Sequence, residues 1–131
     1  MSKVRHLVAV VDDDESVRKA LQRLLRCAGL DVDTYRSGDD FLAAFPARQH
    51  DCLILDLHMP GLNCFEVQAR LRAAAAHVPV VVITGQDTDE ARKRVLEAGA
   101  YSYLGKPLDY KILLEAVADA VAGRAETKAK L

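Results

Sequence analysis

Apolar runs alternate with helical patterns along the whole chain. Continuous apolar runs at residues 7–11, 52–55 and 80–83 are typical of strands that are covered on both faces of a sheet. Weaker strand patterns lie at residues 32–35 and 101–104. Between and after these runs, apolar residues recur at spacings of three and four, which predicts amphipathic helices near residues 17–28, 38–45, 64–71, 91–98 and 112–121.

Residues that cap or end helices stand at the limits of these patterns. Ser37 and Asn63 are favourable N-cap residues, and Glu66 is placed to complete a capping box with Asn63. Gly29 and Gly99 each follow a helical pattern, in the position where glycine commonly ends a helix. Five strands therefore alternate with five helices, which predicts an α/β fold with a parallel sheet and helices on both of its faces.

The size and charge of the chain indicate a single domain that binds neither nucleic acid nor a membrane. Its 131 residues and 14.4 kDa suit one compact domain, which we expect over residues 1–123, followed by a polar tail or linker stub at residues 124–131. The net charge of −1 and the pI of about 6.4 lack the basic excess of a nucleic-acid binder, so no direct contact with nucleic acid is expected. No apolar run approaches the roughly 20 residues that span a bilayer, so no membrane association is expected.

The cysteines and histidines suggest no metal site or disulfide framework. The three cysteines are odd in number and lack C-x-x-C spacing, and the first residues do not suit a secretory signal, which together predict free thiols in the cytoplasm. Cys64 is expected to be exposed, without features that predict a reactive thiolate. Three histidines at the ends of elements are expected to face solvent: His6, His50 and His77.

Polar residues collect at the carboxyl ends of the predicted strands, where open α/β sheets bind ligands. These ends carry several acids, one hydroxyl and one ammonium group: Asp12, Asp13, Asp14, Asp56, Thr84 and Lys106. Carboxylates gathered so closely repel one another, and a hard dication such as Mg²⁺ relieves that repulsion. Asp56 is then the candidate nucleophile for a phosphoryl group, whose oxygens Thr84 could contact and whose charge Lys106 could neutralise.

Four stretches of this sequence resemble the receiver domains of two-component response regulators. They are VVDDDE at residues 10–15, LILDLHMPG at 53–61, ITG at 83–85 and YLGKP at 103–107, and the resemblance runs from about residue 5 to residue 122. The chain resembles receivers that precede helix-turn-helix DNA-binding domains in nitrogen-fixation-type transcription regulators. The resemblance implies a flavodoxin-like, doubly wound (βα)5 sheet with the strand order 2-1-3-4-5.

The resemblance also implies a metal site and a phosphorylation site. Asp56 would be the phosphorylated residue, and Mg²⁺ would be bound by Asp12, Asp13, Asp56 and the backbone carbonyl of His58. The side chain of His58 is expected to be exposed. Asp14 could serve only as a helix cap, because an acid is favourable at a helix N-terminus.

A second set of residues would bind the phosphoryl group and respond to it. Thr84 would contact the group, and Lys106 would pair with it. Tyr103 would be the aromatic switch residue that turns inward, although ordinary packing on an edge strand is the alternative. The family often has a cis peptide bond before the proline that corresponds to Pro107, which X-Pro bonds tolerate.

These features predict a phosphoacceptor signalling domain of a phosphorelay. A histidine kinase or phosphotransfer protein would supply the phosphoryl group, and the chain would catalyse only the transfer to itself and its own dephosphorylation, so it is not expected to be an enzyme in the usual sense. Phosphorylation would change the conformation and regulate an output, in such relatives transcription. A homodimer could form through the face of the fourth helix, fifth strand and fifth helix.

Two other functions fit parts of the sequence. A Mg²⁺-dependent phosphatase that forms an aspartyl phosphate could act on small phosphomonoesters, but it would need a second acid two residues after the nucleophile, where this chain has His58. A flavodoxin-like flavin binder would need a phosphate-cradling loop after the first strand, where the acidic cluster would repel the phosphate of the cofactor.

One position departs from the family pattern. Asn63 and Cys64 stand where these domains commonly have Asp-Gly. Asn63 still suits an N-cap, but the β-carbon of Cys64 would restrict the loop if that residue required a positive φ. The departure therefore concerns the mobility of the loop and the rate of phosphorylation, not the existence of the site.

Overall fold

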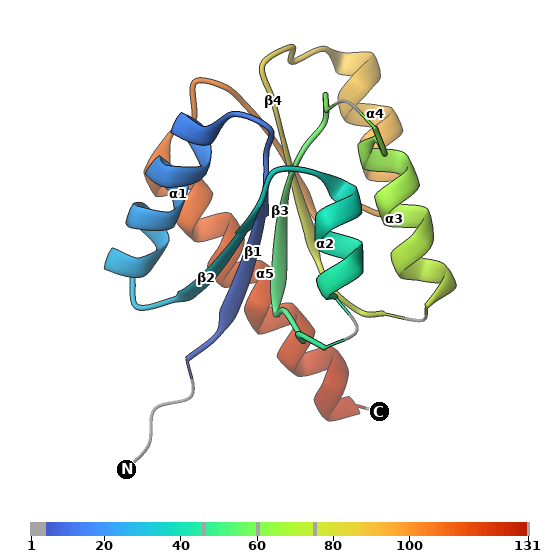
Figure 1. Ribbon diagram of the computed structural model, residues 1–131. Coiled ribbons are helices and arrows are strands. Elements are labelled where there is room, and N and C mark those ends of the chain that lie inside the picture. Colours follow the sequence, from blue (N-terminus) through green and yellow to red (C-terminus); the bar gives the residue numbers. More distant parts are fainter. Residues whose placement is uncertain (1–4, 46, 60, 75, 131) are drawn as a thin grey trace.

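Five parallel strands form one twisted sheet at the centre of the molecule (Figure 1). The computed structural model describes residues 5–45, 47–59, 61–74 and 76–130, with side chains described up to residue 123. The strands are β1 (Leu7–Val11), β2 (Asp31–Tyr35), β3 (Cys52–Asp56), β4 (Val80–Thr84) and β5 (Ser102–Gly105). Their order is β2-β1-β3-β4-β5, which confirms the predicted flavodoxin-like topology.

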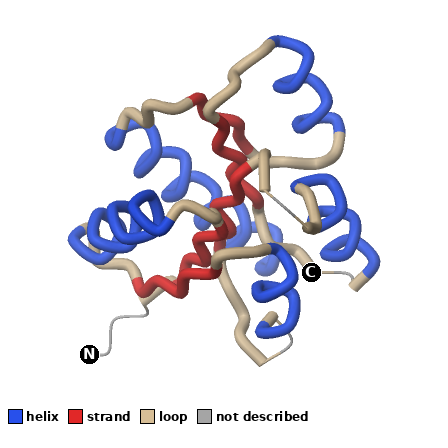
Figure 2. Tube along the Cα trace, turned by 45° about the horizontal axis from the view of Figure 1, so that its top comes forward, coloured by secondary structure: helices blue, strands red, loops and turns tan. Residues whose placement is uncertain are grey.

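Helices cover both faces of this sheet (Figure 2). They are α1 (Glu15–Cys27), α2 (Gly38–Ala44), α3 (Cys64–Ala73), α4 (Asp89–Glu97) and α5 (Tyr110–Lys130). Helices α1 and α5 pack in one hydrophobic cluster with one face of the sheet, and α2, α3 and α4 contribute to the cluster on the other face. No helix in the described part of the chain is both long and apolar enough to cross a membrane.

The apolar runs of the sequence become strands that are buried on both faces. Val8 and Val10 of β1 belong to the cluster under α1 and α5, whereas Ala9 and Val11 belong to the opposite cluster. Every residue of β3 is buried, and so is every residue of β4. Because successive side chains of a strand point to opposite faces, a strand covered twice needs apolar residues along its length, and in β3 and β4 only the last residues, Asp56 and Thr84, carry a charged or hydroxyl group.

The ends of the helices follow the caps that the sequence predicts. The Ser37 hydroxyl accepts a hydrogen bond from the backbone N–H of Asp40 at 3.0 Å. Asn63 and Glu66 form the predicted capping box, with reciprocal bonds of 2.9 and 3.1 Å. Helix α5 continues to Lys130 and thus through most of residues 124–131. The role of that segment as a tail or linker stays a prediction, and Pro46 and Pro60 lie outside the described residues.

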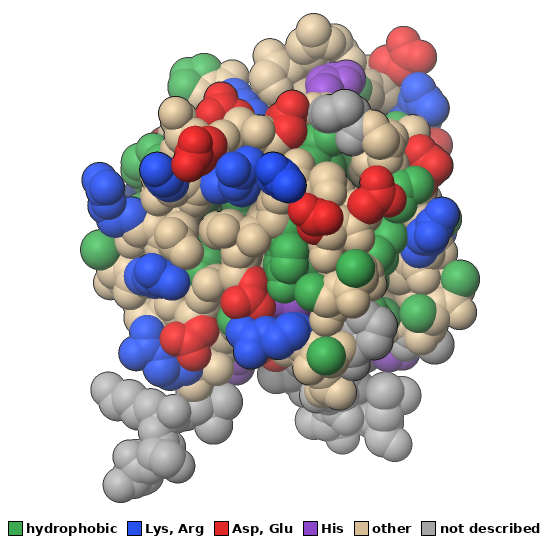
Figure 3. Space-filling view, in the orientation of Figure 1, with side chains coloured by type: hydrophobic (Ala, Val, Ile, Leu, Met, Phe, Trp, Pro, Cys, Tyr) green, Lys and Arg blue, Asp and Glu red, His purple; other side chains and the backbone are tan. Residues whose placement is uncertain are grey.

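Charged side chains of both signs are mixed over the face shown in Figure 3. This mixture agrees with the formal net charge of −1 for the chain. Among the large apolar side chains, four remain exposed in the described part of the chain: Leu96, Tyr101, Tyr110 and Ile112. Ile112 is half exposed, so it does not share the buried face of α5 with Leu113 and Val117.

His50 is fully buried, which corrects the expectation that it faces solvent. Its ring packs against Phe41 and Tyr35, and its Nε2 lies 3.0 Å from Oδ2 of Asp33. Its Nδ1 is buried without a hydrogen-bond partner among the described residues. The neutral ring with the proton on Nε2 fits this environment, because a proton on Nδ1 would be left unbonded. His77 is exposed, as expected, and the side chain of His6 is 42% exposed.

The burial of His50 predicts a pH dependence of stability. Desolvation lowers the pKa of His50 below its usual 6.5, although the hydrogen bond and charge of Asp33 act in the opposite direction. The unfolded chain therefore takes up this proton first. The stabilising contribution of neutral His50 is complete above a pH of about 6.5 and is lost as the pH falls below that value.

Between about pH 7.5 and about pH 5.5, we expect the wild type to lose more free energy of unfolding than the His50→Phe variant. The extra loss should be up to about 1.4 kcal/mol for each pH unit by which folding lowers the pKa of His50. Chemical denaturation of both proteins at both pH values measures the difference, in which the other titrating groups cancel. Equal losses in the two proteins would contradict the prediction.

Gly38 allows α2 and α3 to pack closely at the start of α2. A β-carbon at this position would lie 2.7 Å from Cγ2 of Val67 and 3.4 Å from the backbone oxygen of Leu62. Val67 is fully buried, so its short branched side chain has little room to move. The absence of a side chain at Gly38 is therefore a packing requirement rather than a requirement of backbone conformation.

We expect Gly38→Ala to lower the free energy of unfolding by about 1–2 kcal/mol, because overpacking outweighs the better helix propensity of alanine. Gly123→Ala is the matched control, since its β-carbon would meet only ordinary contacts at 3.8 and 3.9 Å from Tyr101. This control should be neutral or stabilise the protein by up to about 1 kcal/mol. Denaturant titration measures both variants, and a neutral Gly38→Ala would refute the packing argument.

Candidate functional site

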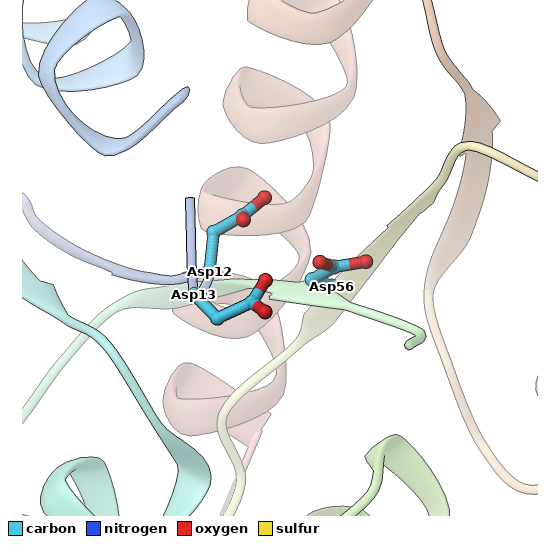
Figure 4. Close-up of side chains that lie close together, drawn as sticks. All are labelled: Asp12, Asp13 and Asp56. Carbon is cyan, nitrogen blue, oxygen red and sulfur yellow. The ribbon is translucent and has the colours of Figure 1, made fainter. Parts of the chain in front are cut away.

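The strand ends place the predicted site residues on one edge of the sheet. Val11 of β1 pairs with Leu55 of β3, so the next residues, Asp12 and Asp56, lie side by side. Asp13 follows Asp12, and one carboxylate oxygen of each of the three aspartates lies within 4.8 Å of the others. Figure 4 shows the three side chains together, two from the end of β1 and one from the end of β3.

Lys106 reaches this cluster from the loop after β5. Its Nζ lies 3.2 Å from Oδ2 of Asp12 and 3.9 Å from Oδ2 of Asp56. The lysine is therefore close to both buried carboxylates, as the sequence predicts. The peptide bond between Lys106 and Pro107 is cis, as the resemblance implies.

Asp12 is fully buried, and each of its polar atoms has a partner. Its backbone N–H donates to the carbonyl oxygen of Tyr35 at 3.1 Å, and its own carbonyl oxygen accepts from Nη1 of Arg18 at 2.8 Å. Its Oδ1 accepts from the backbone N–H of Asp14 at 2.9 Å, and its Oδ2 faces Lys106. A buried carboxylate without such partners would be costly, so these contacts determine where Asp12 can lie.

The environment of Asp56 disfavours its charged form when no cation is bound. Only 5% of the residue is exposed. Burial and the nearby charge of Asp12 raise its pKa to about 6, although Lys106 and a 3.2 Å hydrogen bond from the backbone N–H of His58 oppose the shift. A cation between the carboxylates would remove the repulsion that contributes to this shift.

The donor atoms at this edge fit a magnesium ion. Asp12, Asp13 and Asp56 supply hard carboxylate oxygens, and the Asp13 side chain is exposed so that solvent reaches the cluster. Mg²⁺ prefers such oxygen ligands and commonly retains several waters. The backbone of His58 lies next to Asp56, and its side chain is exposed, as expected.

Asp14 has a different task from its two neighbours. Its carboxylate accepts hydrogen bonds from the backbone N–H groups of Ser16 and Val17, at 2.8 and 3.4 Å. These bonds cap the N-terminus of α1. Asp14 is not part of the cluster of three aspartates, so the alternative that it serves as a helix cap is confirmed.

Thr84 and Tyr103 lie on the same face of neighbouring strands. Val82 of β4 pairs with Tyr103 of β5 in the same hydrophobic cluster, and Thr84 follows Val82 by two residues. Thr84 is fully buried, and its Oγ1 accepts a hydrogen bond from the backbone N–H of Gln86 at 3.0 Å. The register therefore places the two predicted switch residues on neighbouring strands, two positions apart.

Tyr103 is packed inside the protein rather than along its surface. It is 2% exposed, and the guanidinium carbon of Arg92 lies 5.1 Å from the centre of its ring. Its buried hydroxyl makes no hydrogen bond of good geometry with any described residue. Burial, and next to it the charge of the nearby Asp87, raise the pKa of this hydroxyl. The inward position and the packing are thus observed, whereas the switch role stays a prediction.

The unusual pair Asn63-Cys64 is accommodated without strain. Asn63 caps α3, and Cys64 is the first residue of that helix, so it needs no positive φ. Contrary to the expectation of exposure, Cys64 is fully buried, and its thiol donates to Oε1 of Gln68 at 3.2 Å. Burial, and next to it the charge of Asp56, raise the pKa of the thiol to about 12.

Two contacts near the site are not predicted by the sequence patterns. Arg18 bonds the backbone of Asp12, and Gln68 bonds Cys64. Arg18 stands one helical turn after the acidic triplet, and this position was the only signal that could have suggested its contact. Gln68 is a polar residue on the buried side of a helix, where an apolar residue is usual, and only the packed structure shows its partner.

Comparisons with known proteins agree with this geometry. The family model of the response regulator receiver domain matches residues 8–118. The chain is 34% identical over 116 residues to nodulation protein W of Bradyrhizobium diazoefficiens, covering 88% of this chain and 51% of that protein. It is also 34% identical over 119 residues to the transcriptional regulatory protein FixJ of Azorhizobium caulinodans, covering 91% of this chain and 56% of that protein.

A solved structure supports the same relationship. The crystal structure of FixJ-N superposes with a TM-score of 0.84 at 31% identity, and the match covers 92% of this chain and 96% of that one. The chain spans about half the length of the two curated relatives named above. The activities and partners of those longer proteins therefore do not transfer directly to this chain.

The burial of two cysteines predicts unequal thiol reactivity. Cys27 is exposed, whereas Cys52 and Cys64 are buried and have pKa values raised to about 12, first by desolvation. We expect the native protein to react rapidly with a disulfide reagent at one thiol per chain, and at all three only after denaturation. A colorimetric thiol assay measures both stages. The Cys27→Ser variant should lose the rapid phase, and rapid reaction of native Cys64 would contradict the structure.

Proposed function

The chain belongs to the family of response regulator receiver domains, the signalling domains of two-component systems, and we propose that its Asp56 accepts a phosphoryl group in a Mg²⁺-dependent reaction. One observation carries the proposal: three carboxylates share a site within 4.8 Å, with the ammonium group of Lys106 at 3.2 Å from one of them. Such a site combines a nucleophile, ligands for a hard cation and a fixed positive charge.

The proposed reaction transfers the phosphoryl group from a phosphohistidine of a kinase or phosphotransfer protein. A carboxylate oxygen of Asp56 attacks the phosphorus atom, a P–O bond forms, and the P–N bond to the histidine breaks. The electron pair of that bond leaves with the histidine ring. The product is an acyl phosphate on Asp56, and attack by water on the phosphorus later releases inorganic phosphate and restores the carboxylate.

The residues of the site divide the work of this reaction. Asp12, Asp13, Asp56 and the carbonyl oxygen of His58 would hold Mg²⁺, which when bound neutralises charge on the carboxylates and on the phosphoryl oxygens. Lys106 stays beside Asp56 as a fixed charge on the incoming group. These contributions are positioning and electrostatic stabilisation, which account for most of the catalysis in phosphoryl transfer.

We further propose that phosphorylation acts through Thr84 and Tyr103. The Thr84 hydroxyl would turn from the backbone N–H of Gln86 toward a phosphoryl oxygen, and the packing of Tyr103 would adjust to this movement. A change of population between two conformations would follow. The surface of α4, β5 and α5 would change with it, and this surface would form a homodimer or contact an output domain that regulates transcription. The chain would act in the cytoplasm, where free thiols stay reduced.

A phosphatase acting on small phosphomonoesters is not favoured. The family match is to receiver domains. Position 58, two residues after the nucleophile, holds a histidine whose side chain is exposed, in place of the acid that would serve a leaving group. The remaining turnover expected of this chain is the slow loss of its own phosphoryl group.

The assignment of Asp56 is tested by phosphorylation with a small phosphoryl donor such as acetyl phosphate in the presence of Mg²⁺. We expect intact-mass analysis to detect one phosphoryl group per chain in the wild type and none in Asp56→Asn, because the amide is not a nucleophile for phosphorus. Chelation of Mg²⁺ should also abolish the labelling. Full labelling of Asp56→Asn would exclude this residue as the acceptor.

The metal ligands are tested with two neighbouring variants that remove the same charge. Asp13→Asn should weaken Mg²⁺ binding by at least about tenfold, because a ligand of the cluster is lost. Asp14→Asn should bind Mg²⁺ nearly as the wild type does, because asparagine is an equally good N-cap. Isothermal titration with Mg²⁺ measures both. Equal weakening in the two variants would mean that total charge, not the cluster, governs binding.

A further inference from the structure

Arg18 connects helix α1 to the backbone of the buried acid Asp12. Its own backbone N–H donates to the carbonyl oxygen of Asp14 at 3.0 Å and so closes the first turn of α1. Its half-buried side chain extends back past that turn, and Nη1 donates to the carbonyl oxygen of Asp12 at 2.8 Å. One residue therefore bonds both ends of the three-residue segment 12–14, which carries the first two aspartates of the cluster.

Apart from its carbonyl group, the polar groups of Asp12 are held by other contacts, so the orientation of that carbonyl group is what remains to be determined in the segment. Its N–H is held by Tyr35, and its carboxylate is held by Asp14 and Lys106. The peptide group that contains the Asp12 carbonyl also contains the N–H of Asp13. A donor fixed on that carbonyl therefore limits the rotation of the peptide that leads to Asp13, whose exposed carboxylate has to meet Asp56.

We propose that Arg18 is a positioning residue that holds the segment 12–14 in the conformation that binds Mg²⁺. The inference rests on the proposed Mg²⁺ site, and it adds a residue outside the ligand set. The guanidinium group is suited to this task because it is planar, always charged and a strong donor to an oxygen acceptor. Groups that orient metal ligands without touching the metal commonly contribute about tenfold or more to the affinity for the metal.

The charge of Arg18 and its hydrogen bond have opposite effects on Mg²⁺ binding. A positive charge near the cluster repels a cation, so removing the charge alone would strengthen the binding of Mg²⁺. Removing the hydrogen bond would weaken binding, because the segment would have to be ordered when the ion binds. The sign of the change in affinity therefore separates positioning from simple electrostatics.

The decisive experiment compares Mg²⁺ binding to the wild type, Arg18→Met and Arg23→Met. Methionine retains a long unbranched apolar side chain but has neither charge nor donor. Arg23 lies on the same helix and is exposed, so Arg23→Met removes the same charge farther along α1. Isothermal titration with Mg²⁺ alone gives the dissociation constant, and thermal unfolding without metal reports the stability of each protein.

We expect Arg18→Met to bind Mg²⁺ about tenfold more weakly than the wild type, and Arg23→Met to bind it within about twofold of the wild type or slightly more tightly. Equal or tighter binding by Arg18→Met would overturn the proposal and leave Arg18 as a residue that stabilises only the start of α1. Such a structural role would lower the unfolding temperature without weakening the binding of Mg²⁺ to the folded protein.

A second variant keeps the test decisive if Arg18→Met does not fold. Arg18→Lys retains the positive charge, but lysine is shorter and lacks the planar fork. Weaker Mg²⁺ binding by this variant supports positioning, because the charge is unchanged, and wild-type affinity overturns it. Failure of the wild type itself to bind Mg²⁺ would instead refute the proposed function, and with it this inference.

Discussion

Three carboxylate groups have to be held within 4.8 Å of one another while two of them are buried, and much of the structure serves this requirement. Like charges in a medium of low polarity repel strongly, so the two buried acids, Asp12 and Asp56, need partners, whereas Asp13 is exposed. Asp12 accepts hydrogen bonds from the backbone N–H of Asp14, the ammonium group of Lys106 and the guanidinium group of Arg18. Burial, and next to it the charge of Asp12, raise the pKa of Asp56 to about 6, and a cation bound between the carboxylates would relieve the repulsion.

The parallel sheet makes this gathering possible. Its two faces are covered by helices, so its central strands accept only apolar side chains, and polar groups are confined to the strand ends. Strands β1 and β3 are neighbours although a helix, a strand and another helix separate them along the chain. Because β1 and β3 are parallel and in register, residues that follow Val11 and Leu55 meet at the same edge. The chemistry therefore depends on topology as much as on the identity of the acids.

The loop after β3 leads into a helix whose first residue has a buried thiol. This residue is Cys64, and its thiol donates a hydrogen bond to Gln68 in the next turn of α3. The capping box of Asn63 and Glu66 retains the start of the helix. A packed residue thus stands where the resembling domains commonly have a flexible glycine. The backbone N–H of His58 still donates to Asp56.

The sequence by itself determined the number and type of the elements, the parallel sheet and the residues at its strand ends, because apolar periodicity and capping residues act over a few positions. With the resemblance, it also predicted the order of the strands and the members of the site. Only the tertiary structure decided the burial of His50 and Cys64, the inward packing of Tyr103 and the contact of Arg18 with Asp12. These features depend on which distant segments cover a side chain. A polar residue can face water or a buried partner without a change in the helix or strand that contains it. Local sequence patterns therefore carry little information about such contacts.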